Sequence, residues 1–171
     1  MMPELPAKLN AAIEPMTLDD LDAVTTIERA SFPTVWHPSA YLGELQSGNT
    51  CYLVARWESE VIGFAGMWLL FEEGHITTLA VKPEYRRHGV GKALLIGLIR
   101  EALRRGGSRL TLEVREGNAV ARTLYEQFGF AAVAYLPRYY VDTGEDAVVM
   151  WVTGIDSPEY LSQLQEAESK R

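Results

Sequence analysis

A basic, glycine-containing turn between a predicted strand and a predicted helix is the feature that most restricts how this chain can fold. Residues 86–92 read Arg-Arg-His-Gly-Val-Gly-Lys, after an apolar β-type run at residues 75–81 and before an amphipathic helical pattern. The first N–H groups of a helix have no partner inside the helix and lie at the positive end of its dipole. Because Gly89 and Gly91 lack side chains, a bulky anion can approach that backbone closely. The pattern therefore predicts a strand–turn–helix unit with a cradle for a pyrophosphate group.

Two known phosphate-binding motifs can be excluded by spacing. A P-loop needs a glycine five residues before Gly91 and Ser or Thr after Lys92, but Arg86 and Ala93 occupy those positions. A dinucleotide fingerprint needs a third glycine where Leu94 stands. A basic turn that simply precedes an ordinary helix remains as the alternative to a phosphate site.

Composition and charge restrict the class of protein. The 171-residue chain has the usual size of one domain, with 47% apolar and 23% charged residues. A net charge of −7 argues against general nucleic-acid binding, which needs a dominant basic face. No apolar run approaches the ~20 residues of a membrane span, and Met1–Pro6 lacks the basic and apolar regions of a secretory signal. Cys51 is the only cysteine, so no intramolecular disulfide can form. We therefore expect a cytoplasmic protein without membrane or direct nucleic-acid contact.

Strand-type and helix-type segments alternate along the chain, which predicts an α/β fold with a mixed sheet and helices on both faces. Strands are expected at residues 11–14, 50–57, 61–71, 74–81, 109–115, 130–136 and 147–153. Helices are expected at residues 17–31, 38–48, 89–106 and 119–128, the last capped by Asn118. Residues 1–154 are expected to form one domain, and residues 155–171 a frayed helical or disordered tail.

Further motifs follow the turn in a fixed order. They are Leu79-Ala80-Val81, the turn at 86–92, Leu112-Glu113-Val114-Arg115, Asn118, and Ala121 through Leu124-Tyr125 to Gly129-Phe130. Together, over roughly residues 50–152, they resemble the GNAT (GCN5-related N-acetyltransferase) family. Within that family the chain is most similar to the bacterial RimI-type, ribosomal-protein alanine N-acetyltransferases, on residues 112–115 and on Tyr139-Tyr140 ahead of residues 145–150. Phe32-Pro33 and Trp36 resemble the Phe-Pro-Trp element of that type, although Thr34 and Val35 separate the proline from the tryptophan here.

The resemblance implies a GNAT fold, a mostly antiparallel sheet in which a central parallel strand pair, residues 74–81 and 109–114, splays apart to admit acetyl-CoA. Glu113 would be the general base and Tyr125 the general acid. The walls of the acceptor slot would include Phe32, Trp36, Tyr139 and Tyr140. The implied acetyl-CoA-binding residues are Leu79, Ala80, Val81, Arg86, Arg87, His88, Gly89, Val90, Gly91, Lys92 and Asn118. From the residues alone, Glu113 also fits a solvated strand position, Tyr125 core packing, and Tyr139-Tyr140 an ordinary strand end.

The chemistry is consistent with this resemblance. A thioester is already activated, so a neutral amine can attack it without an enzyme nucleophile, and the chain has no Gly-x-Ser-x-Gly motif. Cys51 lies in an apolar strand-type run and is expected to be a core residue. His37, His75 and His88 lack metal-ligand spacing, so we expect no metal site. His75, at the head of the splayed strand, either assists proton removal or has a structural role.

The acceptor is expected to be an α-amine. An α-amino group titrates near ~8 and a lysine near ~10.4, so deprotonation at pH 7 costs about 1.4 and about 4.6 kcal/mol respectively. The resemblance implies the N-terminal alanine of small-subunit ribosomal protein eighteen as the target, and the acidity of the chain suits a basic ribosomal partner. Two alternatives remain: acetylation of a small-molecule amine, and non-catalytic binding of acetyl-CoA by a regulator.

Overall fold

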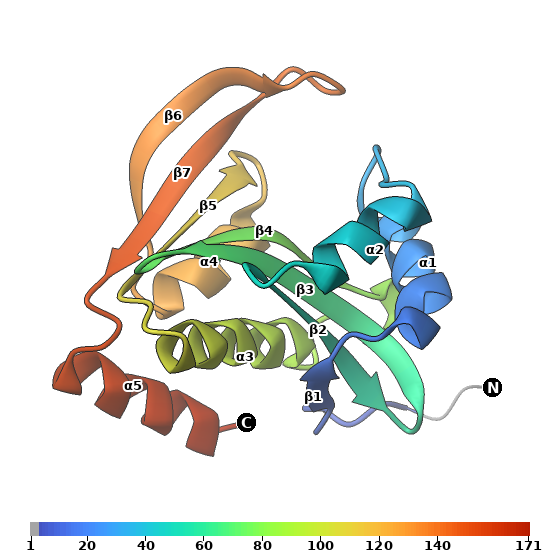
Figure 1. The fold of residues 1–171 in the computed structure, drawn as a ribbon, viewed down its shortest axis with the longest axis horizontal. Coiled ribbons are helices and arrows are strands. Elements are labelled where there is room, and N and C mark those ends of the chain that lie inside the picture. The colour runs from blue at the N-terminus through green and yellow to red at the C-terminus, as the bar shows by residue number, and fades with distance from the viewer. Residues whose placement is uncertain (1–3) are drawn as a thin grey trace.

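The computed structural model describes residues 4–171, so the first three residues of the Met1–Pro6 stretch lie outside the described part. The described residues contain one seven-stranded sheet in the order β1-β2-β3-β4-β5-β7-β6 (Figure 1). The strands are β1 Ala12–Pro15, β2 Thr50–Trp57, β3 Glu60–Leu70, β4 Glu73–Val81, β5 Arg109–Arg115, β6 Ala131–Tyr140 and β7 Glu145–Thr153. Neighbouring strands pair antiparallel, except that β4 and β5 are parallel. The predicted fold class is thus confirmed.

Helices cover both faces of the sheet (Figure 1). They are η1 Leu18–Asp20, α1 Leu21–Ser31, α2 Pro38–Gln46, η2 Pro83–Tyr85, α3 Val90–Arg104, α4 Ala119–Gln127 and α5 Pro158–Ser169. Residues of α1 and α2 share one buried cluster with the sheet, and residues of α3, α4 and α5 share the other. Successive residues of β3 belong to alternate clusters, as Phe64 and Ala65 do. Both faces of β3 are buried, which explains its nearly continuous apolar sequence.

The amphipathic helix predicted after the glycine turn is α3. Its residues Leu94, Leu95, Leu98 and Ile99 are fully buried against the sheet. Burying one such side chain contributes roughly 1.5–3 kcal/mol, so these four residues anchor the helix firmly. The N-terminus of α3 is thereby held at the end of β4.

The central strands β4 and β5 separate after a short paired region. Their register consists of three pairs, and the last joins His75 to Thr111. A β-bulge opposite Gly66 and Met67 of β3 leaves Thr77 of β4 without a register partner. A bulge bends its strand and increases the local twist. The bulge therefore turns the second half of β4 away from β5 and opens the sheet at its centre.

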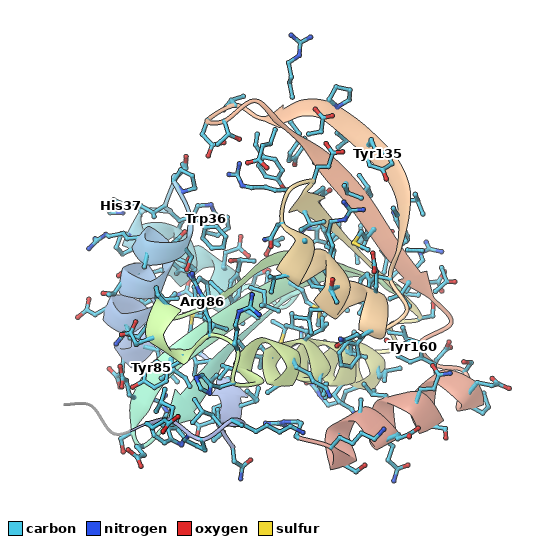
Figure 2. The ribbon with its side chains drawn as sticks, turned by 180° about the vertical axis from the view of Figure 1, so that it is seen from behind. Trp36, His37, Tyr85, Arg86, Tyr135 and Tyr160 are labelled. Carbon is cyan, nitrogen blue, oxygen red and sulfur yellow. The ribbon has the colours of Figure 1, made fainter. Side chains whose placement is uncertain are left out.

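The edge strand β6 is longer than predicted. The sequence predicts a strand end at about Leu136, whereas β6 continues through Pro137 to Tyr140. An edge strand tolerates a proline because one side of its backbone needs no partner. The pairing with β7 is irregular between Leu136 and Tyr140, and Arg138 has a φ of +51°. Tyr135 lies on the outer edge that this strand forms (Figure 2).

The C-terminal segment is the helical one of the two expected alternatives, and it is not frayed. The Ser157 hydroxyl caps α5 by accepting a hydrogen bond from the Tyr160 amide. The Tyr160 hydroxyl donates to the Phe128 carbonyl at 2.8 Å, joining α5 to the end of α4 (Figure 2). Leu164 is buried in the same cluster as α3. One buried leucine in a polar stretch was too weak a pattern to predict this packing. Within residues 4–171, no helix is both long enough and apolar enough to cross a membrane.

Candidate active site

Glu113 lies beside the opening between β4 and β5, in contact with a histidine. The Nε2 atom of His75 on β4 is 2.6 Å from Oε2 of Glu113 on β5, and both side chains are partly exposed. Glu113 follows Thr111 by two residues, so it projects from the same face of the sheet as the last β4–β5 pair. A partly exposed carboxylate at this position can collect a proton from an amine.

The basic turn presents a row of free backbone donors. Among the described residues, none accepts a hydrogen bond from the six consecutive amides of residues 87–92. The first helical hydrogen bond runs from the Ala93 amide to the Gly89 carbonyl at 3.1 Å. Gly89 is the N-cap of α3 with a φ of +82°, and a Cβ added there would meet open space. Such a nest of amides at a helix N-terminus suits a diphosphate.

Two side chains of the turn support its shape. The His88 carbonyl accepts a hydrogen bond from the Leu9 amide at 2.9 Å, and His88 Nδ1 donates to the Pro6 carbonyl at 2.7 Å. Arg86 Nε donates to the Val81 carbonyl at 2.9 Å, and its Nη2 donates to Ser31. Arg86 thus lies between β4 and α1 (Figure 2). The Arg86 amide also donates, to the Pro83 carbonyl at 3.3 Å, so Arg86 shapes the turn, whereas His88 still has a free backbone amide for a cofactor.

The other predicted cofactor residues surround the same opening. A Cβ added to Gly91 would be 3.6 Å from Leu124 of α4, 3.7 Å from Leu79 and 3.9 Å from Val81, so β4, α3 and α4 meet there. Ala80 faces the opposite side and is buried with α1. Asn118 caps α4 through its Oδ1 atom, which accepts from the Ala121 amide at 3.2 Å and leaves its amide nitrogen free for a ligand. The Val81 carbonyl is already used by Arg86, so only the amide of Val81 is open to the predicted contact.

Tyr125 is a buried phenol on α4. Its ring packs against Phe130 with a centroid separation of 5.7 Å, and its hydroxyl makes no hydrogen bond to any other described residue. Burial, with a smaller effect from Tyr140, raises the pKa of Tyr125 to about 12. The phenol therefore stays protonated near neutral pH, as a proton donor must. The structure shows the core packing of Tyr125, and its role as general acid stays a prediction.

A cavity of about 310 Å³ lies between the α1–α2 loop and the turn that joins β6 to β7. These two segments face each other across the open end of the sheet (Figure 1). All four predicted acceptor residues line the cavity, with β4 residues at its floor. The lining residues are Glu28, Phe32, Pro33, Thr34, Trp36, Tyr41, Tyr52, Thr77, Thr78, Arg115, Tyr139, Tyr140, Val141 and Asp142. Six of these 14 residues are aromatic, and Glu28, Arg115 and Asp142 are charged.

Glu28 is a functional candidate that the sequence analysis missed. Its side chain is buried, and its residue is only 5% exposed. Oε1 accepts a hydrogen bond from the Trp36 amide at 2.9 Å, and Oε2 accepts from the Tyr41 hydroxyl at 2.8 Å. This carboxylate joins α1, the loop and α2 into one wall of the cavity, on which Trp36 lies (Figure 2). A glutamate near the end of a helix gives no local sign of such a role.

Arg115 forms the opposite wall of the cavity. Its guanidinium contacts the Asp142 carboxylate at 2.9 Å and lies 4.0 Å from the centroid of the Tyr140 ring. The hydrogen bond from Arg115 holds the pKa of Asp142 below its usual range. These contacts join β5 to the β6–β7 turn and fix the orientation of Tyr140. The sequence placed Arg115 in a family motif but did not predict this contact.

Neither a covalent nucleophile nor a metal is supported by the described residues. Cys51 is buried in the core as predicted, and burial raises the pKa of its thiol to about 11. A neutral buried thiol is a poor nucleophile. Among residues 4–171, no group of three or more His, Cys, Asp and Glu side chains is arranged to hold a metal ion.

Comparison with known proteins points to one family. The sequence profile of the Acetyltransferase (GNAT) family matches residues 21–130. A Bacillus subtilis protein, provisionally named a ribosomal protein bS18-alanine N-acetyltransferase, is 37% identical over 85% of this chain and 97% of its own length. The crystal structure of the Escherichia coli bS18-alanine N-acetyltransferase superimposes with a TM-score of 0.77 at 32% identity, covering 84% of this chain and 94% of that one. A Sulfolobus acidocaldarius N-alpha-acetyltransferase is 31% identical over 84% of this chain and 92% of its own.

These matches agree with the geometry of the opening between β4 and β5. The family profile runs from α1 through α4, so it covers the free amides of the turn, Glu113 and Tyr125. The matched relatives are covered over more than nine-tenths of their own lengths, so the likeness extends over nearly the whole of those proteins. The chain belongs to the GNAT acetyltransferase family.

Proposed function

We propose that this chain is a cytoplasmic N-terminal protein acetyltransferase that moves an acetyl group from acetyl-CoA directly to a protein α-amine. The proposed physiological acceptor is the N-terminal alanine of small-subunit ribosomal protein eighteen. The observation that carries the proposal is the grouping of three features around Tyr140: this residue lines the aromatic cavity, and the Glu113 carboxylate and the buried Tyr125 phenol both lie within electrostatic reach of it. The names of the Bacillus subtilis and Escherichia coli relatives support the acceptor class.

The residues that fit acetyl-CoA are those of the turn and the opening. The free amides of residues 87–92 would bind the diphosphate, and Asn118 and the edge of β4 near Leu79 would bind the pantetheine arm. The thioester supplies an activated acetyl group and a leaving thiolate. The apolar contacts among Gly91, Leu79 and Leu124 would keep water away from the reacting end.

Glu113 and Tyr125 would divide the proton transfers. Glu113 accepts one proton from the acceptor ammonium, and the neutral amine nitrogen then forms a bond to the thioester carbonyl carbon. The C–S bond breaks as the amide forms, and the departing thiolate receives the proton of the Tyr125 hydroxyl. The nitrogen loses its second proton to the tyrosinate as the amide forms, which restores the Tyr125 hydroxyl, and the protonated Glu113 releases its proton to solvent. Direct transfer agrees with the buried, neutral Cys51.

The energy of deprotonation favours an α-amine. At pH 7 a lysine ammonium costs about 3 kcal/mol more to deprotonate than an α-ammonium, from the difference in their ordinary pKa values. One partly exposed carboxylate can therefore deprotonate an α-ammonium more readily than a lysine ammonium. The aromatic cavity can hold the first residues of an extended peptide between Trp36 and Tyr139.

A direct assay tests the proposal. The purified chain is incubated with acetyl-CoA and peptides that begin with Ala, Ser or Met, and the products are measured by mass spectrometry. An N-terminally blocked lysine peptide, spermidine and an aminoglycoside serve as competing acceptors. We expect acetylation of an α-amine, with a dependence on the residues that follow the first. Acetylation of the small amines alone would replace the proposal with the small-molecule alternative, and acetyl-CoA binding without any transfer would favour the regulator.

The cellular acceptor needs a second experiment. Mass spectrometry of ribosomal proteins is compared between cells with and without this chain. We expect the N-terminal alanine of small-subunit ribosomal protein eighteen to lose its acetyl group when the chain is absent. An unchanged acetylation state would exclude this acceptor while leaving the peptide activity in place.

A further inference from the structure

We propose that His75 is a positioning residue that holds the carboxylate of Glu113 in its working orientation. The inference rests on the proposed function, because it assigns to Glu113 the role of general base. It adds that the base is a histidine–carboxylate pair, in which Glu113 accepts the proton and His75 orients the carboxylate. The pair joins β4 to β5 just beyond their last register pair, which is His75 with Thr111.

The contact between the two side chains is well defined. His75 Nε2 lies 2.6 Å from Oε2 of Glu113. An ionised carboxylate can only accept, so the imidazole donates through Nε2–H and leaves its Nδ1 unprotonated when neutral. Hydrogen bonds to charged groups are shorter and stronger than those between neutral groups. This bond is therefore strong enough to hold the carboxylate group in one orientation.

The imidazole is itself held in place from its other side. Trp68 of β3 is the register partner of His75, and the two rings meet edge to face with centroids 5.1 Å apart and planes at 84°. The aromatic contact restricts rotation of the imidazole about its side-chain bonds. His75 can thus transmit the rigid position of the β3–β4 pair to Glu113.

The place of this contact in the fold explains why such support is needed. His75 and Thr111 form the last backbone pair between β4 and β5, and Glu113 is the next residue of β5 on the same face. Beyond that pair the backbone of β4 no longer restrains β5. A glutamate side chain at the edge of an opening has three rotatable bonds and only partial burial. The hydrogen bond from His75 replaces the missing restraint.

The pair leaves one carboxylate oxygen free. Among the described residues, no group donates a hydrogen bond to Oε1 of Glu113. Oε2 is thus the anchored oxygen, and Oε1 is the oxygen that accepts the proton of the acceptor ammonium. His75 takes no proton in the reaction and touches no reacting atom. Its contribution is orientation, and a small misplacement of a catalytic group can cost about a hundredfold in rate.

The test uses steady-state kinetics of His75→Ala, His75→Gln, Glu113→Gln and the double variant H75A/E113Q on the best peptide acceptor. We expect His75→Ala to lower kcat about tenfold to a hundredfold, with the KM for acetyl-CoA unchanged. His75→Gln keeps an N–H donor and should recover most of the rate. In the Glu113→Gln background, His75→Ala should cause little further loss, because a residue that acts through another adds nothing once that other is removed.

Three results would overturn the proposal. They are an unchanged kcat in His75→Ala, a full additional loss in the double variant, and a failure of His75→Gln to recover any rate while it still binds acetyl-CoA. The tautomer of His75, read from long-range ¹H–¹⁵N spectra of the unaltered protein, gives a readout that needs no turnover. We expect the proton on Nε2, and a proton on Nδ1 alone would contradict the inference. If no amine is acetylated by the unaltered chain, the proposed function fails, whereas the tautomer still decides whether the pair exists.

Discussion

Removal of the Glu28 carboxylate should loosen one wall of the acceptor cavity at a measurable cost in stability. Glu28 accepts two hydrogen bonds, from the Trp36 amide at 2.9 Å and from the Tyr41 hydroxyl at 2.8 Å. Glu28→Ala leaves both donors without this acceptor. Tyr41 is 2% exposed, so its hydroxyl can reach water only through the cavity that it lines.

The magnitude follows from the two orphaned donors. A buried donor left unsatisfied costs about 1–3 kcal/mol, and the Trp36 amide is only part-buried, so it contributes at the lower end. We expect Glu28→Ala to lower the free energy of unfolding by about 2–4 kcal/mol. In a protein of this size each kcal/mol corresponds to roughly 2–4 °C in Tm, so the melting temperature should fall by roughly 4–16 °C.

The assay is thermal and urea unfolding of Glu28→Ala beside a matched control, Arg29→Ala. Arg29 is the next residue on the same helix and is exposed, so its removal should change stability by no more than about 0.5 kcal/mol. Glu28→Gln keeps one carbonyl oxygen and should lie between the two. Peptide KM should rise in Glu28→Ala while the KM for acetyl-CoA stays the same, because Trp36 lines only the acceptor cavity.

Equal stability of Glu28→Ala and Arg29→Ala would refute this reasoning. It would mean that the two donors find other acceptors or water at no cost, so the wall does not depend on Glu28. A rise in the KM for acetyl-CoA that equals the rise in peptide KM would refute the assignment of Glu28 to the acceptor side.

Three further predictions concern the phenol, the turn and the second wall. Burial raises the pKa of Tyr125 to about 12 from an ordinary 10, which stabilises the fold below pH 10, and this contribution is lost as the pH rises through 12. Tyr125→Phe should therefore lose less stability than the unaltered chain when urea unfolding is measured at rising alkaline pH. Its kcat at neutral pH should fall. Gly89→Asp puts a side chain at a φ of +82° and a negative charge beside the free amides, so calorimetry should show loss of acetyl-CoA binding. Gly48→Asp serves as the control, because a Cβ added at Gly48, in the turn before β2, would meet open space. Arg115→Ala removes the contacts that hold Tyr140 and Asp142, so the KM for the peptide should rise. Arg115→Lys keeps the charge but lacks a planar guanidinium to stack on the Tyr140 ring, so it should restore only part of the peptide affinity.

Much of the fold could be predicted because the determining patterns are local. The helical periodicity from Val90 onwards indicates α3, since every fourth or third residue must face the sheet. The alternation from Arg109 to Arg115 indicates β5. The predicted Asn118 cap is present, with its side chain bonded to the Ala121 amide. In each case the residues that decide the structure are neighbours in the chain.

The candidate site was predicted only in part. The acceptor residues Phe32, Trp36, Tyr139 and Tyr140 do line one cavity, which agrees with the family resemblance, and their roles stay a prediction. The contacts that organise that cavity were not foreseen. Glu28 and Trp36 are eight positions apart across a helix end, and no periodic pattern indicates that a side chain there turns back to a loop amide. The length of β6 was also missed: the strand continues through Pro137, which an edge strand tolerates.

By itself, then, the chain determined where its helices, its strands and its glycine turn lie, because backbone preference and apolar periodicity depend on residues within one or two turns of each other. Only the tertiary structure decided that His75 meets Glu113, since these residues are 38 positions apart. Their contact depends on the parallel pairing of β4 with β5 and on the bulge at Thr77 that ends it. Strand order and register arise from the packing of the whole sheet against its helices, and that packing is a sum over distant contacts which no local pattern contains.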